Sequence, residues 1–337
     1  MASLRVSSRL ARAALGAAKP TSIRTFAISA RQQKATKSDL DQLKNPPKGN
    51  PVVSGRGAPE PPAEEAANLK DNYNPATYLG TTKRLPEFAL NDKVVLVTGA
   101  ARGLGLVQAE ALLEAGATEP SEDFYRIQRR AAEELGTTFH YRQIDVRDVP
   151  QLNEIIEEIS NKEGRMDGLV AAAGIQQETT ALEYTAKDAN TMFEVNVTGV
   201  FMTAQAVAKQ MIKHGNGGSM AFIASMSGTV ANRVGLICAA YNSSKAAVMQ
   251  LSRNLASEWG QHGIRVNTIS PGYIVTAMVE ALFVKYPERR REWPTQNMLG
   301  KLSKPEEYRG AAVFLISDAS SFMTGSDMRI DGGHCAW

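Results

Sequence analysis

Cysteine and histidine are scarce in this chain, with two Cys and four His among 337 residues. Cys238 and Cys335 are too few for a disulfide framework, and neither they nor the histidines have the spacing of metal ligands. Long hydrophobic runs are also absent, and none approaches the roughly 20 residues that a bilayer-spanning helix needs. We therefore expect no disulfides, no metal site and no membrane among the partners of the chain.

Acidic residues are missing from residues 1–38, which carry eight Lys or Arg residues. The formal net charge of the chain is +3, so with +8 in this segment the remainder carries −5. In a nucleic-acid-binding protein the part of the chain after residue 38 would itself carry an excess of basic residues, so no nucleic acid is expected as a partner. A segment rich in Arg, Ser and Ala and free of acids is typical of a mitochondrial transit peptide, and residues 24–29 resemble a matrix-processing signal. We expect a location in the mitochondrial matrix; the alternative is a basic tail on a cytoplasmic protein.

The rest of the chain divides into a linker and one domain. Residues 39–85, rich in Pro, Asn, Lys and Glu, are predicted to be a disordered linker, and residues 86–337 have the length of one α/β domain. Strands are predicted at 94–98, 139–144, 168–172, 220–224, 264–269 and 328–330, and helices at 104–115, 123–135, 149–159, 186–214, 239–261 and 305–316. Because apolar strands alternate with helices, we expect a doubly wound, mostly parallel sheet of Rossmann type in three αβα layers.

A glycine-rich turn follows the first predicted strand. Gly99, Gly103 and Gly105 lie between the apolar run 94–97 and a predicted helix. Glycines at such a turn allow the backbone to approach a pyrophosphate, which then lies at the positive end of the helix dipole. The turn is therefore predicted to bind a dinucleotide; the alternative is a helix-entry turn with flexible glycines.

Tyr241 and Lys245 are four residues apart and share one face of a predicted helix. A free tyrosine has a pKa of about 10, too high for efficient proton transfer near neutral pH. A nearby ammonium group favours the tyrosinate and would lower that pKa. We expect Tyr241 to act as general acid in reduction and general base in oxidation; the alternative is an amphipathic helix with a solvated lysine.

Taken together, the glycine-rich turn, Asn196, Ser225 and the Tyr241–Lys245 pair resemble the short-chain dehydrogenase/reductase family. The segment 224–228 and the tail 331–337 are most similar to polyol and sugar reductases of the mannitol, arabinitol, sorbose and xylulose types. The resemblance covers nearly all of residues 86–337 and implies hydride transfer between a nicotinamide cofactor and a secondary alcohol or ketone. It further implies a polyol or ketose as substrate and a homodimer or homotetramer.

The resemblance also assigns roles to single residues. Ser225 would hydrogen-bond the substrate oxygen, with Ser227 as the alternative, and the Asn196 carbonyl would hold a water that relays protons from Lys245. The cofactor would contact Thr98, Gly99, Arg102, Gly103, Leu104, Gly105, Asp145, Val146, Ala173, Gly174, Tyr241, Lys245, Pro271, Gly272, Ile274 and Thr276. Residues 278–302 would form the substrate lid. Alanine occupies positions 171 and 172, where the family usually has asparagine.

The chain departs from the family after Ala117, where the second strand of the sheet is missing. Only four or five residues without an apolar run separate Ala117 from the next predicted helix, which cannot make a buried strand. Either residues 139–144 then lie beside 94–98, or both strands leave buried backbone groups unpaired at about 1–3 kcal/mol each. We interpret the gap, roughly eight to ten residues relative to the usual βαβ layout, as a shortened gene model or splice form of an active enzyme.

The same gap removes the residue that would distinguish NAD from NADP. Arg102 favours NADP, and Arg126, Arg129 and Arg130 could contribute; NAD is not excluded. The function predicted is an NADP(H)-linked polyol dehydrogenase or ketose reductase. The alternatives are a 3-oxoacyl-type carbonyl reductase and a catalytically silent nucleotide-binding paralogue.

Overall fold

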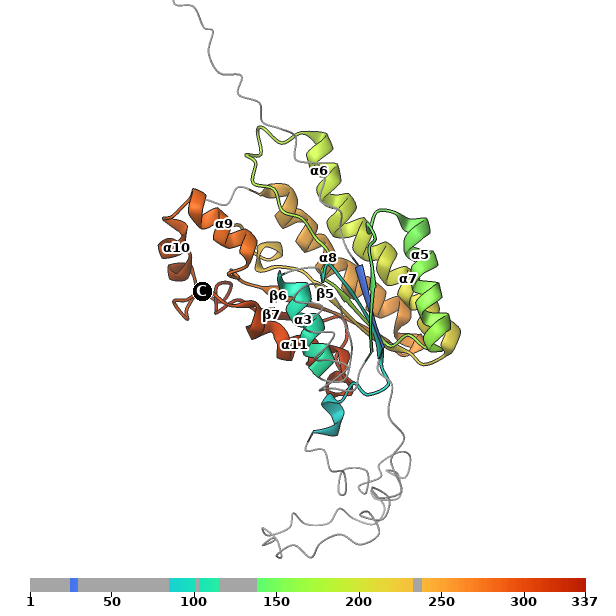
Figure 1. Ribbon diagram of the computed structural model, residues 1–337. Coiled ribbons are helices and arrows are strands. Elements are labelled where there is room, and N and C mark those ends of the chain that lie inside the picture. Colours follow the sequence, from blue (N-terminus) through green and yellow to red (C-terminus); the bar gives the residue numbers. More distant parts are fainter. Residues whose placement is uncertain (1–24, 30–84, 101–102, 115–137, 233–237) are drawn as a thin grey trace, which may run out of the picture.

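The computed structural model describes residues 25–29, 85–100, 103–114, 138–232 and 238–337 (Figure 1). The predicted helix at 123–135 and Arg102 lie outside these residues. Seven strands of the described chain form one sheet in the order β3-β1-β2-β4-β5-β6-β7. The sheet with its flanking helices confirms the predicted α/β class.

Five neighbouring strands of the sheet are parallel. They are β2 (Val94–Thr98), β4 (Gly168–Ala171), β5 (Gly218–Ile223), β6 (Ile264–Pro271) and β7 (Asp327–Ile330). All five residues of β2 are buried, as expected of a continuous apolar run in a parallel sheet covered on both faces. The predicted strand bounds differ from the observed ones by no more than two residues, because strand ends are where sequence patterns are weakest.

The place of the missing second strand is taken by the N-terminal segment. Strand β1 (Thr25–Ser29) lies between β2 and β3 (Thr138–Arg142) and is antiparallel to both. Thr25 is opposite Thr98 on one side and Arg142 on the other. The expectation that β3 would lie beside β2, or that both would stay unpaired, was therefore wrong. Part of the predicted leader supplies partners for backbone groups that are costly to bury alone.

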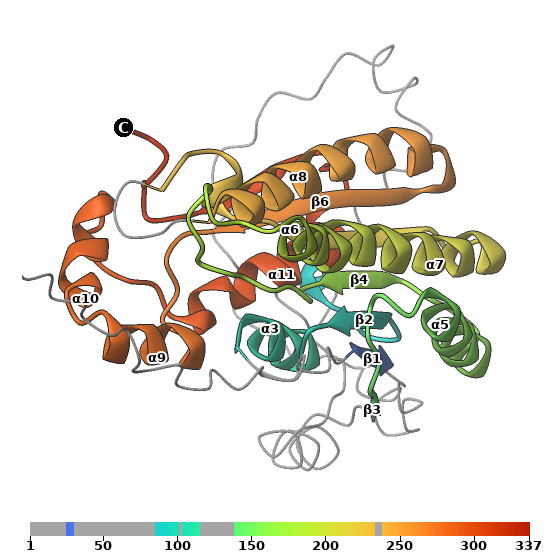
Figure 2. The ribbon, with the colours of Figure 1, turned by 90° about the horizontal axis from the view of Figure 1, so that it is seen from above.

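Two hydrophobic clusters, one on each face of the sheet, pack the sheet against the helices and so form a three-layered fold (Figure 2). Val94 and Leu96 of β2 belong to the cluster that includes residues of α5 (Val149–Glu163), α7 (Gly199–His214) and α8 (Ala239–Trp259). Alternate β2 residues, Val95 and Val97, belong to the cluster with α3 (Gly103–Glu114) and α11 (Arg309–Ile316). Because successive side chains of a strand point to opposite faces, one apolar run packs against both helical layers.

The predicted helix at 186–214 is interrupted. The structure has α6 (Ala186–Phe193), a π-helical turn at Glu194–Thr198 and then α7. Single π-turns within helices are frequent at functional sites, and this one contains Asn196. The hydrophobic periodicity continues through the turn, which is why the sequence pattern predicted one helix.

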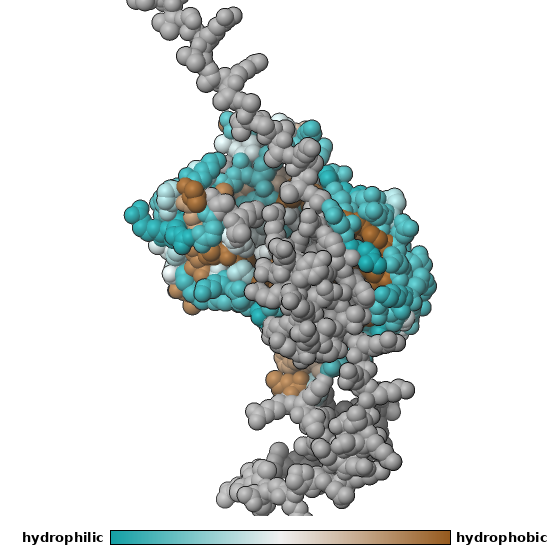
Figure 3. Space-filling model, viewed as in Figure 1, coloured by the Kyte–Doolittle hydropathy of each residue, from teal (hydrophilic) through white to brown (hydrophobic). Residues whose placement is uncertain are grey.

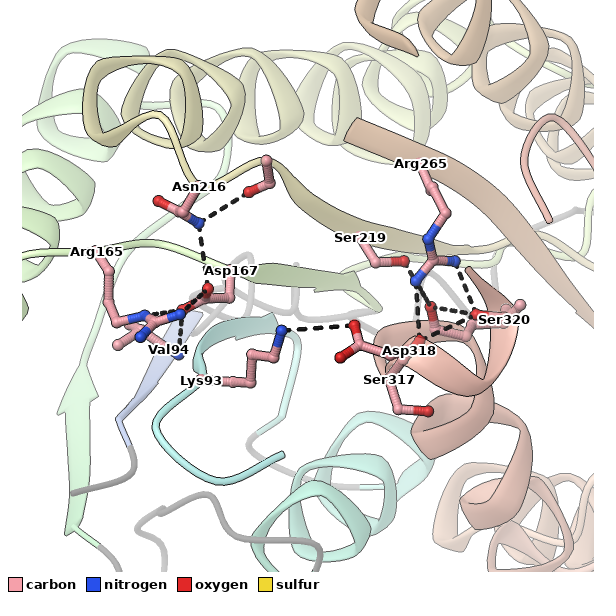
Figure 4. A network of polar contacts seen from close by, with 12 residues as sticks. Lys93, Val94, Arg165, Asp167, Asn216, Ser219, Arg265, Ser317, Asp318 and Ser320 are labelled. Carbon is pink, nitrogen blue, oxygen red and sulfur yellow. Dashed lines mark hydrogen bonds and ion pairs between the residues drawn. The ribbon is translucent and has the colours of Figure 1, made fainter. Parts of the chain in front are cut away.

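A polar network ties together the strand ends opposite the glycine-rich turn (Figure 4). Asp167, 5% exposed, accepts hydrogen bonds from the Val94 amide at 2.8 Å and the Asn216 side chain at 3.1 Å, and pairs with Arg165 at 2.7 Å. Arg265 donates to Ser320 Oγ at 2.7 Å and to carbonyl groups at the end of α11. These contacts fix the starts of β2, β4 and β6.

The outer surface is mainly hydrophilic in the view of Figure 3, with hydrophobic residues visible on the part formed by α9 (Ala277–Lys285) and α10 (Arg289–Glu292). Exposed hydrophobic residues there include Val284, Met298 and Leu299. No helix within the described ranges has the length and hydrophobicity required to span a bilayer. The same ranges contain no group of three or more His, Cys, Asp or Glu that could hold a metal ion.

Candidate active site

The glycine-rich turn joins β2 to α3 and is held against the end of β4. Gly99 has φ +72°, and a Cβ there would lie 2.6 Å from the Ala172 carbonyl oxygen and from the Ala173 nitrogen. A Cβ on Gly105 would lie 2.9 Å from the Gly99 carbonyl oxygen. The Thr98 hydroxyl accepts a hydrogen bond from the Ala173 amide at 3.1 Å. Backbone contacts thus require glycine at both positions and bring the ends of β2 and β4 together.

The segment after β6 approaches the same turn. Gly103, with φ +61°, starts α3, and a Cβ there would lie 3.9 Å from the Thr276 methyl group. Thr276 caps α9 by accepting a hydrogen bond from the Val279 amide at 3.3 Å. Leu104 packs against the hydrophobic cluster beneath α3. The structure therefore brings together predicted cofactor residues from widely separated parts of the chain.

Three further predicted cofactor residues lie along the path from β6 to α9. Pro271 ends β6, the Gly272 amide donates to the Ile330 carbonyl at 3.0 Å, and Ile274 forms an isolated bridge with Ser303. A Cβ on Gly272 would lie 2.8 Å from the backbone of Asp331, so the position cannot carry a side chain without movement. These contacts hold the segment at the carboxyl end of the sheet.

Asp145 and Val146 follow β3, and their contacts are within the protein. Arg147 donates to both Asp145 carboxylate oxygens, and this hydrogen bonding keeps the pKa of Asp145 below its usual value despite partial burial. Val146 is buried beside Ala173 and Val195. Contact of these residues with an adenine ring stays a prediction.

Asn196, Gly174 and Lys245 form a compact group at the end of β4. Asn196 Oδ1 accepts from the Ile175 amide at 2.9 Å, while its Nδ2 donates to the Ile175 carbonyl at 3.0 Å and to Ser244 Oγ at 3.0 Å. A Cβ on Gly174 would lie 3.3 Å from Asn196 Oδ1 and 3.7 Å from Lys245 Nζ. The π-turn thus aims Asn196 at the segment after β4, next to the lysine.

Tyr241 and Ser225 meet on the other side of Lys245. Lys245 Nζ donates to the Ile223 carbonyl at 2.7 Å and lies 5.6 Å from the centre of the Tyr241 ring. Ser225 is the second residue after β5, hydrogen-bonds with Tyr241, and accepts from the Ser227 amide at 3.2 Å. Between the two candidate serines, the contact with Tyr241 favours Ser225.

The protonation states differ from the expectation. Burial raises the pKa of Tyr241 to about 12, a charge on Cys238 would raise it too, and the Ser225 hydrogen bond acts in the opposite direction. Burial lowers the pKa of Lys245 to about 8. The expected lowering of the tyrosine pKa by the lysine was therefore wrong for the protein alone, because desolvation disfavours the charged form of both groups. Tyr241 is a neutral phenol, the form that donates a proton.

These features fit a dinucleotide with a nicotinamide ring. The first backbone N–H groups of α3 have no partner within the helix, and the dipole favours negative charge there. Gly99 lies in the turn before them, and Gly103 and Gly105 lie at the start of α3; a Cβ on Gly99 or Gly105 would meet backbone atoms, and the φ of +61° at Gly103 favours glycine. Gly174 has no side chain beside Lys245 Nζ, where a Cβ would lie 3.7 Å away, so a nicotinamide ribose could approach and be bound by Lys245.

The interactions of Cys238, which lies three residues before Tyr241, escaped the sequence analysis. The Cys238 thiol hydrogen-bonds with Gln176, and burial together with the Glu178 charge raises its pKa to about 11. Arg289 of α10 also acts on Cys238. The only local signal was the position of Cys238 three residues before Tyr241; the other contacts join segments far apart in the sequence.

Tyr273 packs against aromatic rings of the predicted lid and of the tail. Its ring stacks on Trp293 with centroids 4.4 Å apart and meets His334 edge-on at 5.6 Å. Its hydroxyl donates to Gln296 Oε1 at 3.3 Å. The predicted lid is thus packed against the segment after β6, and α9 and α10 lie to one side of the sheet (Figure 2); closure over a substrate stays a prediction.

Comparison with known proteins agrees with this geometry. A family model described as enoyl-(acyl carrier protein) reductase matches residues 99–334. A short chain dehydrogenase/reductase of Aspergillus versicolor, notP′, is 39% identical over 263 residues, covering 74% of this chain and 89% of the relative. The ribulose-forming D-arabinitol 2-dehydrogenase of Candida tropicalis is 33% identical, covering 78% of this chain and 99% of the relative.

Solved structures show the same similarity. A gluconate 5-dehydrogenase of Burkholderia cenocepacia, in complex with NADP and tartrate, superposes with a TM-score of 0.68 at 32% identity, covering 76% of this chain and all of that one (100%). The fold, the family model and the relatives agree, and the chain belongs to the short-chain dehydrogenase/reductase family of oxidoreductases.

Proposed function

We propose that the protein interconverts a ketose and a polyol with NADP(H). The convergence of Tyr241, Ser225 and Lys245 beside the glycine-rich turn carries the proposal. The similarity to an arabinitol dehydrogenase and to a gluconate dehydrogenase supports a polyhydroxylated substrate.

In the reduction, the protein residues orient the ketone and deliver a proton. When bound, a nicotinamide cofactor supplies the hydride to the carbonyl carbon. Ser225 donates a hydrogen bond to the carbonyl oxygen, and the neutral Tyr241 phenol gives that oxygen its proton. Lys245 Nζ and Asn196 Oδ1 both lie close to Gly174, at 3.7 and 3.3 Å from the position of an added Cβ. This proximity supports a role for Lys245 in returning a proton to Tyr241. In the oxidation each proton moves in the reverse direction.

The choice of NADP rests on charge. NAD-dependent enzymes of this architecture commonly use an acid on the neighbouring strand to bind the ribose 2′-hydroxyl. In this chain the register position beside Thr98 belongs to Thr25, and Arg102 precedes the second glycine of the turn. Two similar solved structures contain NADP. A neutral residue and an arginine are compatible with a 2′-phosphate, which an acid would repel.

The experiment is a ketose panel with NADPH and, separately, NADH, followed by absorbance of the reduced nicotinamide. We expect turnover with NADPH that is lost in Tyr241→Phe, which keeps the ring and removes the proton donor. A loss of at least a hundredfold in kcat corresponds to the usual contribution of a general acid. Tight NADPH binding without turnover of any carbonyl would contradict the proposal and support a silent nucleotide-binding protein.

We further propose that residues 1–38 direct the protein to mitochondria and that it acts as a homodimer or homotetramer. The absence of acids among eight Lys or Arg residues supports the first part. A fluorescent protein fused after residue 38 tests it, with Arg5, Arg9 and Arg12 changed to Glu as the control. Light scattering of the purified protein measures the oligomeric state.

A further inference from the structure

Arg289 of the lid and Glu178 of the segment after β4 form a largely buried ion pair. Arg289 Nη1 and Nη2 donate to Glu178 Oε1 and Oε2 at 2.9 and 3.0 Å. The side chains are only 6% and 21% exposed. The guanidinium also lies 4.0 Å from the centre of the Tyr286 ring. Such a two-point contact is the strongest form of carboxylate–arginine pairing.

The pair borders the proposed substrate site. Glu178 lies four residues after Gly174, where a Cβ would be 3.7 Å from Lys245 Nζ, and the charges of Glu178 and Arg289 both affect the pKa of Cys238, three residues before Tyr241. The Arg289 guanidinium lies 5.6 Å from the centre of the Trp293 ring, which stacks on Tyr273 with centroids 4.4 Å apart. The ion pair thus joins the segment after β4 to the aromatic residues that pack on Tyr273, and in our proposal the far end of a multi-carbon substrate lies next to it.

The other basic residues of the lid are exposed. Lys285, Arg290 and Arg291 are exposed, and Arg290 pairs with Glu280, which is also at the surface. Arg289 is the buried basic residue of α9 and α10, and its charge is compensated by Glu178. A substrate carboxylate next to this pair would be repelled by the Glu178 carboxylate and would find the Arg289 guanidinium already paired with Glu178. It would lose its hydration without gaining a partner.

We propose that the Glu178–Arg289 pair makes the site select neutral polyhydroxylated substrates over acids. This inference rests on the proposed function. The outer lone pairs of Glu178 accept hydrogen bonds from the hydroxyl groups at the far end of a ketose or polyol. The pair thereby makes the site favour ketoses as substrates over keto acids such as a ketogluconate.

The test compares L-sorbose with 5-keto-D-gluconate, which differ only in a terminal CH₂OH or carboxylate. Each is measured with the full chain and NADPH as a substrate, or by its Ki against the best ketone of the panel. We expect the wild type to favour L-sorbose at least tenfold. Glu178→Gln releases the Arg289 charge and is expected to move the ratio at least tenfold toward the acid, mainly through KM or Ki.

Two variants provide controls. Arg289→Gln leaves Glu178 uncompensated and is expected to disfavour the acid further. Glu280→Gln breaks the exposed pair with Arg290 on the same lid and is expected to leave the ratio within twofold of the wild type. Melting temperature and NADPH affinity of each variant show whether the fold and the cofactor site are intact.

A wild type that prefers the acid overturns the inference, and so does an intact Glu178→Gln variant with an unchanged ratio. If Glu178→Gln does not fold, the preference of the wild type decides alone. Failure of the proposed function is distinct, because no ketone of the panel would then be turned over by a protein that binds NADPH.

Discussion

Removal of β1 is expected to destabilise the domain. Strand β1 pairs with β2 and β3 over five register positions on each side. A chain that begins at residue 30 lacks this strand, whereas one that begins at Arg24 keeps it. Comparison of the two separates the contribution of β1 from that of the preceding residues.

The magnitude follows from the ladder. Two antiparallel pairings of this length contain about ten backbone hydrogen bonds, each contributing about 1 kcal/mol. Ordering five residues costs about 1 kcal/mol each, which leaves a net loss of about 5 kcal/mol on removal of β1. This is comparable to the whole stability of a domain, about 5–15 kcal/mol. A domain of this size loses about 2–4 °C in Tm per kcal/mol, so the expected decrease is roughly 10–20 °C.

A point variant gives the same test without truncation. Ala27, opposite Leu96 and His140, is the central residue of β1. Ala27→Pro removes a ladder donor and restricts the backbone, so Tm should fall by several degrees. Ala18→Pro, in the same N-terminal segment but outside β1, is the matched control and should leave Tm unchanged. Equal melting of the chains beginning at residues 24 and 30, or of both proline variants, would refute the place of β1 in the sheet.

The other predictions concern the retained N-terminus, the glycine-rich turn, the polar network and the pH profile. Protein isolated from mitochondria should still contain residues 25–29 by N-terminal sequencing; a mature chain that starts later and is fully active would contradict a structural role for β1. Gly99→Ala should reduce NADPH affinity at least tenfold by fluorescence titration, because its Cβ would overlap backbone atoms at 2.6 Å, whereas Gly215→Ala, with φ +70° and nothing within 4 Å, controls for backbone strain alone. Asp167→Ala should lower the free energy of unfolding in urea by about 2–4 kcal/mol, because the Val94 amide and Arg165 lose a buried partner. The control Asp318→Ala breaks the pair with Lys93 at the surface and should lower it by less than about 1 kcal/mol. The kcat/KM for NADPH should fall above pH 8, because Lys245 loses its proton there while Tyr241, with a pKa of about 12, keeps its own. If the same decrease above pH 8 persists in Lys245→Arg, it does not come from Lys245.

Several elements were predictable because their signals are local. The apolar run at 94–98 matches β2 at both ends, since a strand buried on both faces needs a continuous run of apolar residues. Tyr241 and Lys245 share a helical face by spacing alone. The glycine positions follow from the need of a strand–helix turn for backbone contact.

Other features depend on contacts between distant segments. The protonation states of Tyr241 and Lys245 result from burial, which no spacing in the sequence reveals. Glu178 and Arg289 are 111 residues apart, and only the folded lid brings them together. The break at Asn196 was also hidden, because the apolar periodicity on both sides of the π-turn is that of one helix.

The sequence by itself determined the alternation of strands and helices, the glycine-rich turn and the Tyr241–Lys245 pair proposed for proton transfer, because each is encoded within a few neighbouring positions. Tertiary structure decided which segment fills the place between β2 and β3, because strand pairing needs only a compatible backbone and can recruit residues from far away. It also decided the pairing of Glu178 with Arg289, since the two residues are 111 positions apart and only folding brings them together and removes most of their surface from water.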